Sequence, residues 1–320
     1  MQHLNTEQKV CEIGGVKFGG QPGEHPSVCC FSIFQENDRL FEGKRRKKGF
    51  NQAKAEEILK KSEKLSQDTG VSVMADIVAS PGETFDKYVD FVTQTSSMPF
   101  CIDSINIAEK IQGAKYCAEK GLLDRMFYNS LTVWEQDIER EIKEISEIGI
   151  KHVLLVTFDM EDQMPTGRIT GAQKLLDAIE KAGAEFETIF VDTSVMNAPA
   201  AAFCSVANRL IKEKWGFACA SAPSNASYME LKRFKDEMWD FKAWSGVDSA
   251  LEALSAFWYN DLIFSGPIAG AGRVIPSVAT ADAFCAASVF AETKKLPQNS
   301  EHPLFKLFPD FAKQLKALAG

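Results

Sequence analysis

The sequence lacks the short motifs by which metal sites are usually recognised. Its eight cysteines include no C-x-x-C pair, and its four histidines include no H-x-x-x-H pair. A zinc site is built from several Cys or His ligands, so we predict no metal site, although ligands assembled from distant positions stay open. The N-terminus, MQHLNTEQKV, lacks the apolar segment of an export signal. We therefore expect reduced cysteines and a cytoplasmic protein.

Long apolar runs and an excess of basic residues are also missing. No stretch approaches the roughly 18 uninterrupted apolar residues of a membrane-spanning helix, so membrane insertion is not expected. The 36 basic and 44 acidic side chains give a net charge of -8, which disfavours binding to nucleic-acid phosphates. One basic cluster runs from Lys44 to Lys48. We interpret it as a solvated loop, with a localisation signal or an anion-binding patch as less favoured alternatives.

Eight short apolar runs are typical of strands that are buried on both faces of a parallel sheet. They cover residues 27–34, 71–78, 99–103, 125–130, 152–158, 187–192, 216–220 and 261–265. Amphipathic helical patterns lie between them, and Pro81-Gly82-Glu83 is expected to open one of these helices. The other patterns cover residues 51–66, 108–120, 134–148, 170–182, 200–214, 228–239, 247–257 and 277–293.

Alternation of strands and helices indicates an α/β protein with a parallel sheet. Eight strands predict a closed (β/α)8 TIM barrel, because a doubly wound sheet usually stops at about six strands. No Pro-, Gly- or Ser-rich linker interrupts the pattern, so residues 1–320 are expected to form a single domain. Within it, residues 1–26 contain a predicted β-hairpin around Gly14-Gly15 that would cap the N-terminal mouth of the barrel. Residues 294–320 form a tail that ends in a short helix, 311–319.

Polar side chains recur where the predicted strands end, on the face where barrels carry their active sites. They are Asp76, Asp103, Asn129, Asp159, Asp192 and Asn225, the last in the loop after the seventh strand. Any one of them could equally cap the next helix, but six similar junctions favour a site. Acceptors of this kind, without basic residues, suit a neutral heterocycle rich in N–H donors better than a phosphate.

Two further segments have two interpretations each. The glycine-rich stretch from Gly266 to Arg273 follows the last strand, where barrels often bind phosphate, but a tight turn explains it as well. An aromatic stretch is interpreted as core or helix packing, with a docking face for a flat cofactor as the alternative. It consists of Trp239, Phe241, Trp244, Phe257, Trp258 and Tyr259.

Four short segments at the strand ends resemble the pterin-binding methyltransferase superfamily, which includes dihydropteroate synthase. They are CIDS at 101–104, YNS at 128–130, IFVD at 189–192 and SNAS at 224–227. Three longer segments, GGVKFGGQPGE at 14–24, PFCIDS at 99–104 and DRMFYNSL at 124–131, are similar to the H-subunit family of tetrahydromethanopterin S-methyltransferase. Soluble bacterial relatives in this family act on tetrahydrofolate. The resemblance covers nearly the whole chain.

The resemblance implies roles for these residues. Asp103, Asn129 and Asp192 match positions that hydrogen-bond a pterin ring, and Asn225 matches the asparagine near N5. Asp76 and Asp159 are assigned supporting roles. Such roles are chemically reasonable, because a carboxylate accepts from the 2-amino group and N3–H of a pterin together.

The resemblance also implies a reaction, in which N5 of tetrahydrofolate takes the methyl group of methylcob(III)alamin held by a partner corrinoid protein. The expected context is breakdown of a quaternary amine such as glycine betaine, with the enzyme as a cytoplasmic homodimer. Asn225 would be the catalytic residue, by positioning N5.

Two alternatives remain. One is a tetrahydromethanopterin-binding subunit of a membrane methyltransferase complex, without methyl transfer on its own. The other is a dihydropteroate-synthase-like enzyme, which would need basic residues at the strand ends for a pyrophosphate. Those are missing from the sequence.

Overall fold

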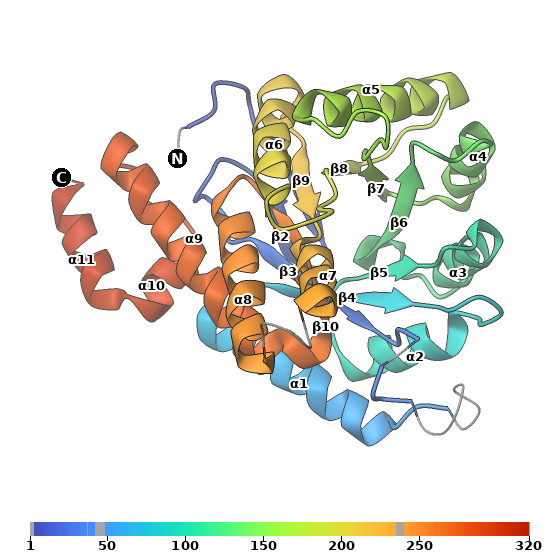
Figure 1. Ribbon diagram of the computed structural model, residues 1–320, viewed down its shortest axis with the longest axis horizontal. Helices are drawn as coiled ribbons and strands as arrows, with labels where there is room; N and C mark the ends of the chain where they lie inside the picture. Colours follow the sequence, from blue (N-terminus) through green and yellow to red (C-terminus); the bar gives the residue numbers. More distant parts are fainter. Residues whose placement is uncertain (1–2, 37, 42–48, 235–239, 320) are drawn as a thin grey trace.

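A computed structural model describes residues 3–36, 38–41, 49–234 and 240–319, with the side chains of 231–234 left out. Eight parallel strands close into a barrel in which the last strand pairs with the first (Figure 1). The predicted (β/α)8 TIM barrel is confirmed. The strands are β3 (Val28–Ile33), β4 (Val73–Val78), β5 (Phe100–Asp103), β6 (Met126–Thr132), β7 (His152–Val156), β8 (Thr188–Asp192), β9 (Ala218–Ser221) and β10 (Leu262–Pro267).

The apolar runs form strands because both of their faces are covered. Alternate side chains, such as Met74, Phe127 and Phe190, fill the barrel interior, while the others pack beneath the surrounding helices. The predicted hairpin is also present as β1 (Val10–Ile13) and β2 (Val16–Gly19). Its Phe18 belongs to the interior cluster and lies 5.3 Å from the Phe190 ring. The hairpin therefore closes the N-terminal mouth, as predicted.

The helices follow the predicted order, but six of them start several residues away from the prediction. Four of these starts are 138 instead of 134, 165 instead of 170, 241 instead of 247 and 271 instead of 277. Gly82 has φ 83° and ends a turn in which the Ser80 carbonyl accepts from Glu83 N. A left-handed residue cannot continue a helix, so α2 begins at Asp86 rather than at Pro81. Helix α7 begins at Pro223, directly after β9, rather than at 228. The helices of the barrel are α1 (Gln52–Thr69), α2 (Asp86–Thr95), α3 (Ile107–Glu119), α4 (Ile138–Ile148), α5 (Pro165–Ala182), α6 (Ala201–Trp215), α7 (Pro223–Phe234), α8 (Phe241–Phe257) and α9 (Ala271–Thr293).

The C-terminal tail adds α10 (Pro303–Leu307) and α11 (Pro309–Leu318), which lie beside α9 (Figure 1). By length and composition, one helical stretch of the described residues, Ile268–Thr293, could cross a membrane. This is weak evidence, because 61% of its most apolar window is buried inside the molecule. The eight cysteines are free thiols. The basic cluster Lys44–Lys48 and Trp239 lie outside the described residues.

Candidate functional site

Four of the predicted site residues face the inside of the barrel at its C-terminal end. Asp76, Asp103, Asn129 and Asp192 each lie two residues beyond an interior-facing side chain of the same strand, so they share that face. The strand register places Asp103 directly opposite Asn129 on the neighbouring strand. The structure therefore brings these four residues into one layer at the mouth.

Hydrogen bonds join part of this layer. The Asp76 Oδ1 atom accepts from the Cys101 thiol at 3.0 Å and from Asn129 Nδ2 at 3.3 Å. Asp76 is buried and Asn129 is 9% exposed. Asp103 lies partly open at the mouth. Its carboxylate accepts no hydrogen bond from the described part of the chain. Asp76 thus orients Asn129, while Asp103 keeps its acceptor oxygens available.

Burial raises the pKa values of the carboxyl groups in this layer. Desolvation raises the pKa of Asp76, and the nearby charge of Asp103 raises it further. The pKa of Asp103 is also raised by burial, but Lys110 opposes that rise. Lys110 is itself held by the Ser130 carbonyl at 2.6 Å and by Glu141 at 3.3 Å. The layer consequently tends to carry less negative charge than its three carboxyl groups would carry in water.

Asp192 lies in a different setting, beside a buried arginine. Burial raises its pKa to about 6, opposed by a hydrogen bond from Ser194 N at 2.7 Å and by the charge of Arg168. Arg168 on α5 is fully buried. It donates to the carbonyls of Thr193 and Ser194, directly after Asp192, and to those of Gln163 and Met164. All of these acceptors are protein carbonyls, so Arg168 fixes the loop that follows β8.

Asn225 is placed differently from the prediction. It lies in the first turn of helix α7, where its backbone N–H donates to the Ala222 carbonyl at 3.1 Å, rather than in a loop. Its side chain is exposed and borders a cavity of about 490 Å³. The cavity is lined by Gln35, Val195, Met196, Ser224, Asn225, Tyr228, Met229, Gly266 and Pro267.

Asp159 is not joined to the others by any contact among the described residues. Its carboxylate accepts from Glu161 N at 2.9 Å and lies 3.5 Å from Lys174 Nζ. These contacts lower the pKa of Asp159. They are those of a loop-capping residue, so its predicted supporting role has no geometric backing.

The glycine-rich stretch forms a tight turn. β10 runs through Pro267, and a single 3-10 turn (Ile268–Gly270) leads into α9. Arg273 is paired with the buried Asp248, to which its Nε donates at 2.8 Å, and it lies over the Trp244 ring. The only charged group of the stretch is thus already neutralised. The aromatic stretch is divided: Trp244 and Tyr259 are buried, whereas Phe241 and Trp258 are exposed.

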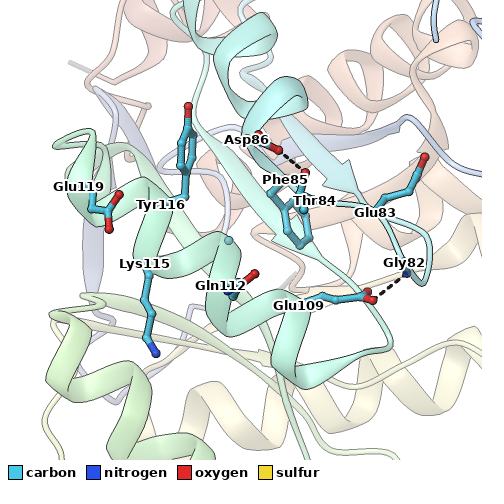
Figure 2. Close-up of a pocket in the computed structure, with 11 residues that line it drawn as sticks. Gly82, Glu83, Thr84, Phe85, Asp86, Glu109, Gln112, Lys115, Tyr116 and Glu119 are labelled. Carbon is cyan, nitrogen blue, oxygen red and sulfur yellow. Dashed lines mark hydrogen bonds between the residues drawn. The ribbon is translucent and has the colours of Figure 1, made fainter.

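A larger hollow, of about 550 Å³, lies outside the barrel between α2 and α3 (Figure 2). Phe85 packs there against Gly113, where a Cβ atom would lie 2.5 Å from the ring. Two of its carboxylates have structural partners. Glu109 accepts from Gly82 N at 2.7 Å, and Asp86 accepts from the Thr84 hydroxyl. This hollow is explained by local packing.

The chain matches one protein family over most of its length. Residues 6–295 match the sequence model of a family that is described as tetrahydromethanopterin S-methyltransferase MtrH subunit. The chain belongs to the MtrH family. The resemblance seen in the sequence is therefore confirmed.

Two relatives show how far this MtrH-family likeness extends. The H subunit of tetrahydromethanopterin S-methyltransferase from Methanopyrus kandleri is 30% identical over 317 residues, which cover 93% of this chain and 96% of the relative. Its counterpart in Methanothermobacter thermautotrophicus is also 30% identical, over 96% of this chain and the whole relative. The likeness spans both proteins almost from end to end.

Solved structures support the fold of this MtrH-family chain. A dihydropteroate synthase from Yersinia pestis, crystallised with a sulfonamide drug complex, has a TM-score of 0.61 at 12% identity, covering 87% of this chain and 100% of that one. A dihydropteroate synthase from Xanthomonas albilineans, with indole-2-carboxylic acid and 6-chloroguanine, has a TM-score of 0.57 at 10% identity, covering 91% and 99%. At such identities the likeness shows the barrel fold alone.

Two residues at the mouth of this MtrH-family barrel were missed by sequence reasoning. The sequence predicted a mouth without basic side chains, but Arg168 lies beside Asp192. The feature of the sequence that could have revealed it is the position of this arginine soon after the fifth barrel strand, where the next helix begins. Cys101 was interpreted as a small hydrophobic residue packed in a strand, yet its thiol donates to Asp76. Its position two residues before Asp103 placed it on the same inward face.

Ligand binding at this mouth should depend on pH. If Asp192 must be ionised to accept hydrogen bonds, affinity is full above its pKa of about 6 and falls as the pH drops through that value. For one such group we expect about tenfold weaker pterin binding at pH 5 than at pH 7. Isothermal titration of the apoprotein across this range measures it. The Asp192→Asn variant is titrated alongside, because the pterin's own ionisation affects both proteins equally. If pterin affinity depends on pH equally in both proteins, the assignment to Asp192 is contradicted.

Proposed function

We propose that this chain binds a reduced pterin at the C-terminal mouth of its barrel and catalyses methyl transfer between N5 of that pterin and a corrinoid. The observation that carries the proposal is the layer of the buried Asn129 and Asp192 and the partly open Asp103, in a chain of a methyltransferase family. Bound at this mouth, a corrinoid would supply the methyl group as an electrophile and accept the electron pair.

The layer is chemically suited to the edge of a pterin. A pterin presents a 2-amino group and an N3–H, both donors, beside a 4-oxo acceptor. Asp103 and Asp192 offer acceptor oxygens, since Asp192 uses Oδ1 for Ser194 N and Asp103 accepts from no donor among the described residues. Asn129 offers an amide that can donate or accept. A buried carboxylate is stabilised by such donors, which supports a ligand of this class.

Asn225 would act at the other end of the ring. It borders the cavity at the mouth and sits on α7, whose Ser224 hydroxyl donates to the Phe264 carbonyl at 2.8 Å. This bond fixes the first turn of α7 against β10. In our proposal the Asn225 amide orients N5, so that the protein contributes positioning and electrostatics without a covalent intermediate.

The names of the relatives favour tetrahydromethanopterin over tetrahydrofolate as the pterin. They contain neither tetrahydrofolate nor glycine betaine, so the interpretation as a subunit of a complex is better supported than a folate-dependent enzyme of quaternary-amine breakdown. We propose a tetrahydromethanopterin-type pterin as the substrate, with the chain working beside a corrinoid-carrying partner.

One assay tests the proposal. Purified protein is mixed anaerobically with methylcobalamin and either tetrahydromethanopterin or tetrahydrofolate, and the absorbance of cob(I)alamin is followed. We expect its appearance with tetrahydromethanopterin, and at a lower rate with tetrahydrofolate. Faster transfer to tetrahydrofolate would restore the folate interpretation. Pterin binding without methyl transfer to either pterin would indicate that the chain is only a pterin-binding subunit.

Replacing Asn225 by Ala should separate turnover from binding. Because the amide is assigned to N5 and not to the edge of the ring, we expect kcat about thirtyfold lower with pterin affinity nearly unchanged. Steady-state kinetics and pterin titration measure the two quantities. Asn197→Ala is a matched control, since that exposed asparagine accepts from Ala200 N in the loop before α6. Equal turnover in Asn225→Ala and wild type would remove the assignment.

A further inference from the structure

Helix α7, which carries Asn225, has one side toward the cavity at the mouth and another toward the protein interior. Its residues Asn225, Tyr228 and Met229 line the cavity. Because an α-helix has 3.6 residues per turn, Ser227 points about 200° away from Asn225, two positions earlier. Ser227 is fully buried. Whatever holds the Ser227 side chain therefore fixes the direction in which Asn225 points.

A buried ion pair holds Ser227. The Ser227 hydroxyl donates to Oδ1 of Asp248 on α8, and Asp248 is fully buried. The other carboxylate oxygen, Oδ2, accepts from Nε of Arg273 at 2.8 Å and also from its Nη2. Since Arg273 lies in the first turn of α9, this one carboxylate joins α7, α8 and α9.

Trp244 on α8 holds the same turn of α7 a second time. Its Nε1 donates to the Ser227 carbonyl at 2.8 Å. Its ring lies 4.7 Å from Cζ of Arg273 and 5.1 Å from the Tyr228 ring. Trp244 and Arg273 come from the aromatic and the glycine-rich stretch, for which the sequence left two interpretations each. We call the four residues that hold this turn the α7 anchor: Ser227, Trp244, Asp248 and Arg273.

The end of β10 confines the same turn. Gly266 has φ 71°, and a Cβ atom there would lie 3.2 Å from Cβ of Ser224 and 3.2 Å from Cε2 of Tyr228. At such close approach the densely packed interior leaves α7 no room to move toward β10. The first turns of α7 are therefore fixed both by packing and by the α7 anchor.

We propose that Asp248 and Arg273 are positioning residues for methyl transfer, which fix the orientation of α7 and with it the Asn225 amide. The inference rests on the proposed function, in which that amide orients N5. Packing of helices does not require a buried ion pair, because apolar side chains of similar volume often stabilise a fold at least as well. An ion pair that is hydrogen-bonded at both carboxylate oxygens fixes direction as well. Direction matters here, since a displacement of about 1 Å at a reacting group costs about a hundredfold in rate.

The test is a double-mutant cycle between Arg273 and Asn225. Wild type, Arg273→Ala, Asn225→Ala and the double variant are assayed with methylcobalamin and saturating tetrahydromethanopterin, and pterin affinity is measured by titration. We expect Arg273→Ala to lower kcat about tenfold and to change pterin affinity by less than about twofold. In the Asn225→Ala background it should lower kcat by less than about twofold, because the group that Arg273 positions is already gone.

Two further variants separate positioning from folding. Ser227→Ala cuts the bond between α7 and Asp248 and leaves the ion pair intact, so it serves as the test if Arg273→Ala does not fold. We expect it to lower kcat about fivefold, again only where Asn225 is present. Arg209→Ala is the matched control, because that arginine is paired with Glu213 on α6 at 2.7 Å. It should have the kcat of wild type.

Added guanidinium ion gives an independent readout. At millimolar concentrations, far below the molar range that unfolds proteins, it should occupy the space beside Asp248 and restore part of the kcat of Arg273→Ala. It should restore nothing in the double variant. Losses that multiply in the double variant, or a wild-type kcat in both Arg273→Ala and Ser227→Ala, would overturn the positioning role and leave the proposed function standing. Absence of methyl transfer in the wild type would overturn the proposed function, and this role with it.

Discussion

Replacing Asp103 by Asn is expected to weaken pterin binding about a thousandfold. The substitution keeps the volume but turns one acceptor oxygen into an NH2 donor, which would face the N–H donors of the ring. A site built to hydrogen-bond a ligand loses about 3–5 kcal/mol when a buried partner is mismatched. Asp103 has no compensating protein donor among the described residues, so the loss falls on the ligand. Equilibrium titration with tetrahydromethanopterin at pH 8 measures it.

Asp159→Asn is the matched control for this change. Asp159 follows a strand on the same face, but its carboxylate serves Glu161 N and Lys174. We expect less than about twofold change in pterin affinity, because the amide oxygen can still cap the loop. A thousandfold loss in Asp159→Asn, or none in Asp103→Asn, would exchange the roles of the two residues.

The barrel was predictable because its strands are buried on both faces. A run such as HVLLV of β7 has no polar face, so it marks a strand of a covered parallel sheet without any alternation. The location of Asp103 and Asp192 at the C-terminal mouth was predictable too, since each ends its strand. The resemblance then supplied the chemistry of those ends, which composition alone does not give.

One error was local, and the other came from contacts that are distant in the sequence. Asn225 was placed in a loop because the helical pattern was predicted to begin at residue 228, whereas α7 begins at Pro223, and proline is well tolerated in the first turn of a helix. Arg168, just before the predicted helix 170–182, was passed over because its acceptors, the carbonyls of Thr193 and Ser194, lie 25 and 26 positions away. The parallel pairing of β7 with β8 brings the loops that follow these strands together.

That buried arginine leads to the second large effect, on stability. Arg168 is fully buried and donates to four backbone carbonyls from two loops. Removing it leaves buried acceptors unsatisfied, each of which costs about 1–3 kcal/mol. A methionine fills a similar volume without donating, so Arg168→Met isolates the hydrogen bonds and the charge from the packing.

We expect Arg168→Met to lower the free energy of unfolding by about 4 kcal/mol, measured as a lower urea midpoint at unchanged m-value. Lys174→Met, an exposed cation on the same helix, should change it by less than about 1 kcal/mol. Loss of the arginine charge should also raise the pKa of Asp192, because that charge opposes the effect of burial. The pH at which pterin affinity falls would then move upward in Arg168→Met. A purely structural arginine would lower stability and leave that pH where it is, so the two measurements together decide whether Arg168 also tunes the site.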